Sequence, residues 1–84
     1  MATVEVYCSN FCIYCTMALQ LLDRKGVEYH KILVDREPGL RAEMERRSQR
    51  TSVPQIFIDD RHIGGCDDLL ALDRGGRLDP LLHT

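Results

Sequence analysis

Two cysteines, Cys12 and Cys15, stand three residues apart in the stretch SNFCIYCTMALQLL, where an apolar helical run begins. If Cys12 caps this helix and Cys15 lies one turn inside it, the helix rise and radius place their Cα atoms about 5 Å apart. Disulfide-bonded Cα atoms usually lie roughly 4.4–6.8 Å apart. The pair can therefore close and reopen as a disulfide with little movement of the backbone.

The two thiols are not expected to be equivalent. Cys12 would face the unpaired N–H groups and the positive end of the helix dipole, which stabilise a thiolate. Cys15 would lie within the helix and be more enclosed. In a thiol–disulfide exchange, Cys12 is then the attacking nucleophile, and Cys15 is the resolving thiol that displaces a partner from a mixed disulfide.

Two other uses of the cysteines stay open at this point. Cys8 and Cys66 bring the number of thiols to four, and structural zinc sites often use four ligands. The paired C-x-x-C knuckles of such sites are missing, however. The cysteines could also pack as small apolar residues. Cys66 is expected to be a small side chain that packs within a turn, with a regulatory role as the alternative. Cys8 could form a disulfide outside the catalytic pathway.

The elements around the two cysteines follow from local patterns. Residues 3–7 and 28–34 read as strands. Between them, apolar residues recur at helical spacing before Gly26, a stop signal, so the pattern predicts a helix over 13–25. Two strands joined by such a helix imply a parallel βαβ unit with a right-handed crossover. The apolar helix positions are Met17, Ala18, Leu21 and Leu22.

The second half of the chain predicts two further helices and a hairpin. The expected elements are a charged helix within 36–50, strands over 54–58 and 61–63, a helix within 66–76 and a final turn capped by Asp79. The order βαβ, α, ββα predicts a four-stranded mixed sheet with helices on both faces. This is the thioredoxin-like α/β fold class.

Length and charge limit the class of protein. Eighty-four residues predict a single domain over 1–84, and the net charge of -2 argues against a nucleic-acid partner. Arg46, Arg47 and Arg50 cluster on a solvated helix face, with a small anion site as the alternative. The N-terminus lacks the pattern of a signal peptide, and no apolar run is long enough to cross a membrane. We therefore expect a cytoplasmic monomer without a membrane partner, in a compartment where a C-x-x-C is redox-active or metal-binding.

Three stretches in order resemble one family over essentially the whole chain. CIYC (12–15), TSVPQIFID (51–59) and GGCDD (64–68) are similar to the glutaredoxins, specifically the short bacterial dithiol type. The resemblance implies a glutathione-dependent thiol–disulfide oxidoreductase with Cys12 as nucleophile and Cys15 as resolving thiol. It implies no bound cofactor, with glutathione as co-substrate.

The resemblance also implies how glutathione is held. Pro54 would follow a cis peptide bond and turn the backbone of Val53 toward the cysteinyl part of glutathione; the alternative is that Pro54 only starts an edge strand. Gly65 and Cys66 would offer N–H groups to the γ-glutamyl carboxylate. Asp67 would bind the neighbouring ammonium, unless it serves only to cap the helix.

Three side chains complete the implied glutathione site. Tyr14 should be exposed and line the groove, and Ser52 takes the place of a more usual threonine. Arg46 would meet the glycyl carboxylate of glutathione. The scattered histidines are expected to have no catalytic part.

The chain departs from the family pattern at two positions beside the thiols. Ile13 stands where the family usually has proline, which would fix the first helical φ in advance. In some relatives the loss of that proline makes room for a [2Fe–2S] cluster shared between two monomers, so a cluster-binding dimer is the alternative function. Ser9 stands where a basic residue is common, which removes a charge that would stabilise the Cys12 thiolate.

The sequence therefore predicts an enzyme that reduces protein–glutathione mixed disulfides and protein disulfides through a Cys12/Cys15 dithiol. The predicted partners are glutathione and glutathionylated or disulfide-containing proteins.

Overall fold

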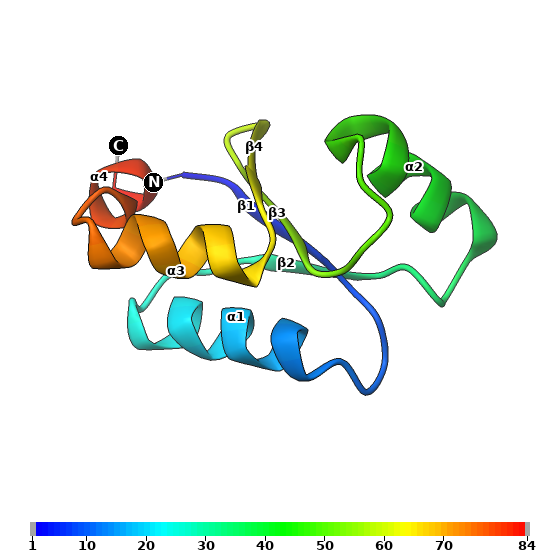
Figure 1. Ribbon diagram of the computed structural model, residues 1–84, viewed down its shortest axis with the longest axis horizontal. Coiled ribbons are helices and arrows are strands. Elements are labelled where there is room, and N and C mark those ends of the chain that lie inside the picture. Colours follow the sequence, from blue (N-terminus) through cyan, green and yellow to red (C-terminus); the bar gives the residue numbers. More distant parts are fainter. Residues whose placement is uncertain (1, 84) are drawn as a thin grey trace.

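The computed structural model describes residues 2–83 and contains a four-stranded mixed sheet with helices on both faces (Figure 1). The strand order is β2-β1-β3-β4; β1 and β2 are parallel, and the other neighbours are antiparallel. The predicted fold class is confirmed. The elements are β1 (Val4–Cys8), α1 (Ile13–Arg24), β2 (His30–Leu33), α2 (Pro38–Ser48), β3 (Gln55–Ile58), β4 (Arg61–Gly64), α3 (Cys66–Arg74) and α4 (Leu78–Leu82).

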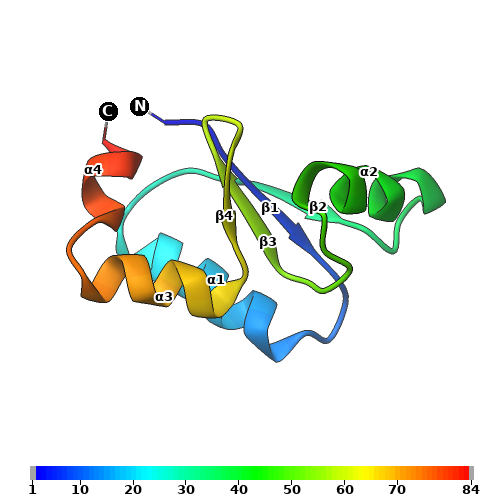
Figure 2. The same cartoon turned by 45° about the horizontal axis from the view of Figure 1, so that its top comes forward.

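The larger core lies between the sheet and the layer of α1, α3 and α4, and α1 and α3 lie side by side there (Figures 1 and 2). Alternate residues of the two central strands, such as Val6 and Ile56, face this layer because side chains point to opposite faces along a strand. Leu22 of α1 and Leu69 of α3 meet them and are fully buried. Met17, by contrast, is exposed, so the apolar stripe of α1 is narrower than its sequence suggested.

The opposite face of the sheet is covered by α2 alone, with a smaller core of Tyr7, Val34, Met44 and Phe57. Since five of the eleven residues of α2 are charged, ordinary apolar packing contributes only part of this contact. The remainder comes from Arg47.

Arg47 is a packing residue of α2. Its guanidinium lies 4.0 Å from the ring centroid of Phe57, donates to the Tyr7 hydroxyl at 2.7 Å and pairs with Glu5 at 3.0 Å. The hydrogen bond with Glu5 is the main reason that the pKa of Arg47 is raised. The alternative of an anion site that includes Arg47 is therefore wrong, because an internal carboxylate already occupies this side chain.

The ends of α1 and α4 differ slightly from the prediction. The helix α1 ends at Arg24, and Lys25 follows it and pairs with Asp73 at 2.6 Å and Asp79 at 3.1 Å. Asp79 does not cap α4, because Arg77 holds that position and Asp79 lies in the first turn. The charge attraction to Lys25 ties α4 to the end of α1.

No helix within residues 2–83 combines the length and the apolar character needed to cross a membrane.

Candidate functional site

Cys12 lies at the N-cap of α1, in extended backbone, and its side chain is half-buried. The N–H of Cys15 donates to Cys12 Sγ at 3.2 Å. This contact and the positive end of the helix dipole both favour negative charge on the sulfur. Cys12 is therefore the more exposed of the two thiols, and it lies at the positive end of the helix.

Cys15 lies one turn further along α1 and is only 3% exposed. Burial raises the pKa of its thiol well above the ordinary value, and a hydrogen bond with Cys12 raises it further. The neutral thiol is therefore the stable form of Cys15 near neutral pH, so Cys15 does not compete with Cys12 as the attacking group.

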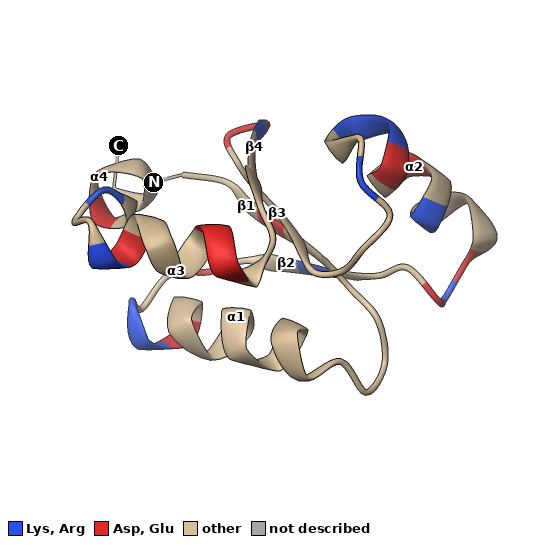
Figure 3. Cartoon of the chain, viewed as in Figure 1, with Lys and Arg blue, Asp and Glu red and all other residues tan. Residues whose placement is uncertain are grey.

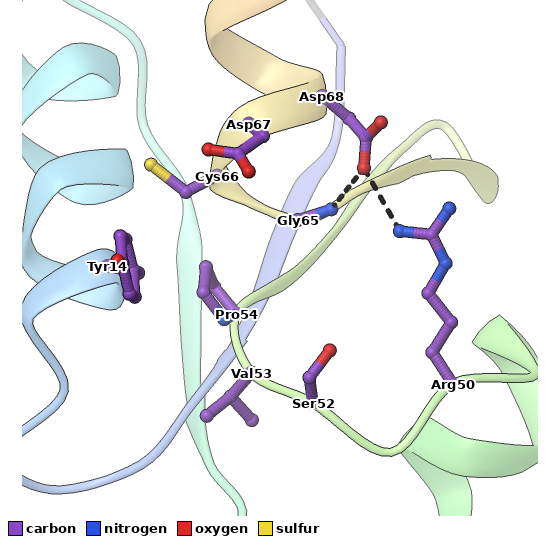
Figure 4. A pocket seen from close by; sticks show the side chains of 9 residues that line it. All are labelled: Tyr14, Arg50, Ser52, Val53, Pro54, Gly65, Cys66, Asp67 and Asp68. Atoms are coloured by element: carbon purple, nitrogen blue, oxygen red, sulfur yellow. Dashed lines mark hydrogen bonds and ion pairs between the residues drawn. The ribbon is translucent and has the colours of Figure 1, made fainter.

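A cavity of about 270 Å³ lies between the N-terminal ends of α1 and α3 and the loop that precedes β3 (Figure 4). Tyr14 stands on one side of it, and the first turn of α3 stands on the other. The predicted residues Ser52, Val53, Gly65 and Asp67 are brought together here from segments far apart in the chain. The full lining is Tyr14, Arg50, Ser52, Val53, Pro54, Gly65, Cys66, Asp67 and Asp68.

The loop before β3 presents open backbone to Cys12. The Val53–Pro54 peptide bond is cis, and Cys12 Sγ lies 4.0 Å from the carbonyl oxygen of Val53. Within residues 2–83, neither the N–H nor the C=O of Val53 has a backbone hydrogen-bond partner. The alternative that Pro54 merely starts an edge strand is wrong, since β3 lies between β1 and β4. A peptide could therefore pair with Val53 beside the reactive sulfur.

A buried amide holds this loop in place. Gln55 is fully buried, and its side-chain amide donates to the carbonyl oxygen of Ser52 at 3.0 Å. Its side-chain oxygen lies 2.7 Å from Nε2 of His62. These contacts satisfy Gln55 and anchor the backbone next to Val53, so His62 acts through packing and hydrogen bonding.

The start of α3 separates the roles of the two adjacent aspartates. The carboxylate of Asp68 accepts the N–H of Gly65 at 3.0 Å and pairs with Arg50 at 3.0 Å (Figure 4). These two contacts, the N–H of Gly65 first, lower the pKa of Asp68. Asp67 is exposed at the cavity and has no ion pair within residues 2–83. Since Asp68 does the capping, the charge of Asp67 remains available to a ligand.

The structure places Arg50, and not Arg46, at the cavity. Arg46 lies on α2 with its side chain exposed, whereas Arg50 follows the end of the helix. Between them, Gln49 adopts a left-handed conformation at φ 61° and turns the chain. This turn directs Arg50 toward Asp68.

From its first residue to Leu22, α1 carries no Lys, Arg, Asp or Glu, and this part of the helix is tan in Figure 3. Phe11 is fully exposed, and Ile13 and Tyr14 are 74% and 60% exposed. Between residues 9 and 22 the chain carries no charged side chain. The side chains that flank Cys12 in the sequence are therefore apolar and open to solvent.

The comparisons with known proteins agree with this geometry. The family model described as Glutaredoxin matches residues 4–63. The chain is 56% identical over 82 residues to "Glutaredoxin 3" of Escherichia coli, with 98% of this chain and 99% of that protein covered. The chain belongs to the glutaredoxin family.

Two solved glutaredoxin structures are similar to the chain. The buckwheat glutaredoxin–glutathione complex matches with a TM-score of 0.89 and 32% identity over 96% of this chain and 76% of that one. A structure described as "Metal Binding of Glutaredoxins" matches with a TM-score of 0.77 and 50% identity over 100% of this chain and 91% of that one. The predicted family and fold are confirmed, and membership implies thiol–disulfide oxidoreductase activity.

Sequence reasoning considered Arg50 as part of a basic cluster and Asp68 as a helix cap, but it did not place either residue at the cavity of this glutaredoxin. Asp68 had a local signal, because it stands three residues after Gly65, the position at which a carboxylate reaches back to a helix cap. The basic cluster did not distinguish Arg50 from Arg46, because the direction of Arg50 depends on the turn at Gln49. As for the zinc alternative, no three Cys, His, Asp or Glu side chains within residues 2–83 are grouped so that they could hold a metal ion.

Ile13→Pro is expected to stabilise this glutaredoxin. Ile13 is the first residue of α1, where proline fits, and Cys12 before it has φ -104° and ψ 111°, which a residue before proline tolerates. The 74% exposed side chain of Ile13 loses little burial. The gain should be about 0.4–1 kcal/mol in the free energy of unfolding, because proline restricts the unfolded chain. Urea denaturation of the variant and the wild type measures this difference. A variant that is less stable than the wild type by the same amount would contradict the prediction.

Proposed function

We propose that residues 1–84 form one glutaredoxin domain that reduces protein–glutathione mixed disulfides and protein disulfides through Cys12 and Cys15. The observation that carries the proposal is the position of Cys12 at the N-cap of α1, with its sulfur 4.0 Å from the carbonyl oxygen of Val53, a residue without a backbone hydrogen-bond partner within residues 2–83. This arrangement joins a stabilised thiolate to a strand-like surface that can align a peptide disulfide.

In the monothiol route, only Cys12 changes its bonding. The Cys12 thiolate attacks the glutathione sulfur of a mixed disulfide, and the thiol of the protein substrate leaves with the electron pair of the broken S–S bond. A second glutathione then attacks glutathionylated Cys12, releases glutathione disulfide and restores the thiolate. Glutathione is the reductant, so two glutathione sulfurs end as one disulfide.

In the dithiol route, Cys15 resolves the intermediate. Cys12 attacks a protein disulfide and forms a mixed disulfide with the substrate. Cys15 then loses its proton, attacks Cys12 Sγ and releases the reduced substrate, leaving a Cys12–Cys15 disulfide for glutathione to reduce. The contact between Cys15 and Cys12 supports this step.

The cavity offers complementary groups to glutathione, as the buckwheat relative was solved with that ligand. The N–H and C=O of Val53 would pair with the cysteinyl residue. The N–H of Gly65 donates to Asp68 at 3.0 Å, so the prediction that this group meets the γ-glutamyl carboxylate is wrong. The N–H groups of Cys66 and Asp67 at the start of α3 would bind that carboxylate, and the side chain of Asp67 would bind the neighbouring ammonium group. Tyr14 and Ser52 would line the sides.

The glycyl carboxylate of glutathione is proposed to meet Arg50. Arg50→Gln should raise the KM for glutathione about fivefold to tenfold, because one half-exposed charged hydrogen bond is lost. Arg46→Gln is the matched control, since it removes the same charge from the same segment but away from the cavity, and its KM should stay near that of the wild type. Steady-state kinetics with varied glutathione compare the two, and a larger effect at Arg46 would contradict the proposal.

The alternative function is a [2Fe–2S]-binding dimer in which Cys12 and glutathione hold the cluster. The solved structure entitled "Metal Binding of Glutaredoxins", which is similar to this chain, supports this alternative. The geometry of one chain favours it less, because Cys15 is already placed to resolve a disulfide on Cys12. We propose a monomer that works in the cytoplasm with glutathione as co-substrate and needs no bound cofactor.

The deciding experiment is reduction of a small glutathione mixed disulfide by the purified wild type, coupled to glutathione reductase and NADPH. Turnover by colourless, metal-free protein supports the oxidoreductase. Protein that purifies brown, or with stoichiometric zinc, and does not turn over would overturn it.

A further inference from the structure

All of the large apolar side chains that are exposed within residues 2–83 lie in one short segment. They are Phe11, Ile13, Tyr14 and Met17, which together form the apolar patch. On α1, Met17 follows Ile13 by four residues and Tyr14 by three, so these three side chains are neighbours on the helix surface. Phe11 belongs to the loop directly before the helix.

The apolar patch borders both the nucleophile and the cavity. Phe11 and Ile13 are the chain neighbours of Cys12, and Tyr14 also stands at the side of the cavity (Figure 4). Single exposed apolar residues are ordinary on a protein surface, whereas a group of them beside a reactive residue is typical of an interaction surface. The patch is therefore continuous with the candidate site.

Phe11 is exposed in a backbone conformation that costs free energy. Its φ is 57°, in the left-handed region that bulky residues rarely adopt. Its side chain is fully exposed, so no burial within the chain offsets this cost. The preceding residue is held from outside the patch, because the N–H of Asn10 donates to the carboxylate of Asp35 at 3.2 Å. Strained residues of this kind cluster at sites that contact another molecule.

We propose that the apolar patch selects protein substrates and that its occupant is a protein whose reactive cysteine is flanked by apolar side chains. The inference rests on the proposed function, because it concerns the substrate of the dithiol route. In that route Cys12 bonds to one sulfur of the substrate disulfide, and the other substrate cysteine leaves with the electron pair of the broken S–S bond.

The covalent intermediate dictates which part of the substrate meets the patch. The substrate cysteine is bonded to Cys12 Sγ, so the residues next to it lie against the surface around that sulfur. This surface includes the carbonyl oxygen of Val53, 4.0 Å from the sulfur, and the chain neighbours Phe11 and Ile13. An apolar substrate side chain there removes apolar surface of both partners from water. A charged or amide side chain loses hydration and gains no hydrogen-bond partner from Phe11 or Ile13.

A second copy of the chain is the competing occupant. A stable contact between copies through the patch would cover Cys12, because Cys12 lies between Phe11 and Ile13 in the chain. The proposed cycle needs Cys12 open to one substrate after another. A partner that leaves when the mixed disulfide is resolved therefore fits the patch better, with Phe11 as an aromatic anchor.

The test compares two symmetric peptide disulfides. Each joins two copies of one short peptide with a single cysteine, which is flanked by leucines in the first disulfide and by asparagines in the second. Reduction is followed with glutathione, glutathione reductase and NADPH. Each kcat/KM is divided by the rate constant of the same disulfide with glutathione alone, which removes differences in intrinsic reactivity. The wild type should prefer the leucine peptide about tenfold.

Three variants locate this preference. Phe11→Asn removes the aromatic ring and introduces a residue that tolerates the left-handed conformation, and the preference should fall to about threefold. Phe11→Asn combined with Ile13→Ser should bring it close to one. Phe11→Leu is the matched control, since it keeps an apolar side chain at the same position, and it should keep the preference. All three should reduce a small glutathione mixed disulfide at about the wild-type rate, because neither position lines the cavity.

Equal corrected rates for the two peptides in the wild type would overturn the inference and leave the proposed function intact. A preference that survives in the double variant would do the same. Sedimentation of the reduced wild type tests the competing occupant, and a dimer that Phe11→Asn dissociates would also overturn the inference. A wild type that reduces neither the peptides nor the small mixed disulfide would overturn the proposed function, and the inference with it.

Discussion

Cys12→Ser is expected to abolish reduction of glutathione mixed disulfides, with a loss of at least about 1,000-fold in kcat/KM. A serine hydroxyl at the N-cap of α1 can still accept the N–H of Cys15, so the helix should remain intact. It cannot form the sulfur–sulfur bond that every step of the proposed cycle requires. The coupled glutathione reductase assay measures the loss, and circular dichroism checks that the variant is folded.

Cys15→Ser is the matched variant, because it removes the other thiol of the same helix. Reduction of a small glutathione mixed disulfide should retain at least about a tenth of the wild-type kcat, since only Cys12 changes its bonding in that route. Reduction of a protein disulfide should fall far more, because no second thiol can resolve the intermediate. Equal losses of glutathione mixed-disulfide reduction in the two variants would contradict the assigned roles. So would a Cys12→Ser variant that keeps this activity while Cys15→Ser loses it.

Gly64→Ala is expected to lower the free energy of unfolding by about 2–4 kcal/mol, as strain and a lost helix cap add together. Gly64 has φ +121°, which side chains rarely adopt, and a Cβ there would overlap the carboxylate of Asp68. Asp68 would have to leave the position from which it caps Gly65 and pairs with Arg50. The KM for glutathione should therefore rise as well.

Thermal unfolding and glutathione kinetics check this variant together. The midpoint Tm should fall by at least about 8 °C in a domain of this size. Gly39→Ala is the control, because Gly39 lies in α2 with open space around it, and alanine there should stabilise the helix by about 0.5–1 kcal/mol. A Gly64→Ala protein as stable as the wild type would contradict the expected overlap.

Much of the fold and part of the site follow from the sequence, because local chemistry determines them. The helical spacing after Cys12 and the stop at Gly26 depend on residues within one helix, and α1 begins and ends close to where they predict. The cap position of Cys12 and the enclosure of Cys15 follow from the same helix. The family resemblance added Val53 and Pro54, whose motif is contiguous in the chain.

Only the tertiary structure decided which charged residues reach the cavity. Whether Arg46 or Arg50 reaches the cavity depends on the left-handed turn at Gln49. Which of Asp67 and Asp68 keeps its carboxylate free for a ligand depends on which one pairs with Arg50. These side chains are separated by some twenty positions in the sequence, and no local pattern encodes their contact.

The shared burial of Cys8 and Cys15 in one core cluster has the same origin. Six residues separate the two cysteines, yet one ends a strand and the other lies on a helix, so their distance depends on how α1 packs against the sheet. The sequence by itself determined a dithiol at the start of a helix, because helix geometry is local. The packing of that helix decided which other groups surround the dithiol, because burial joins residues that are distant along the chain.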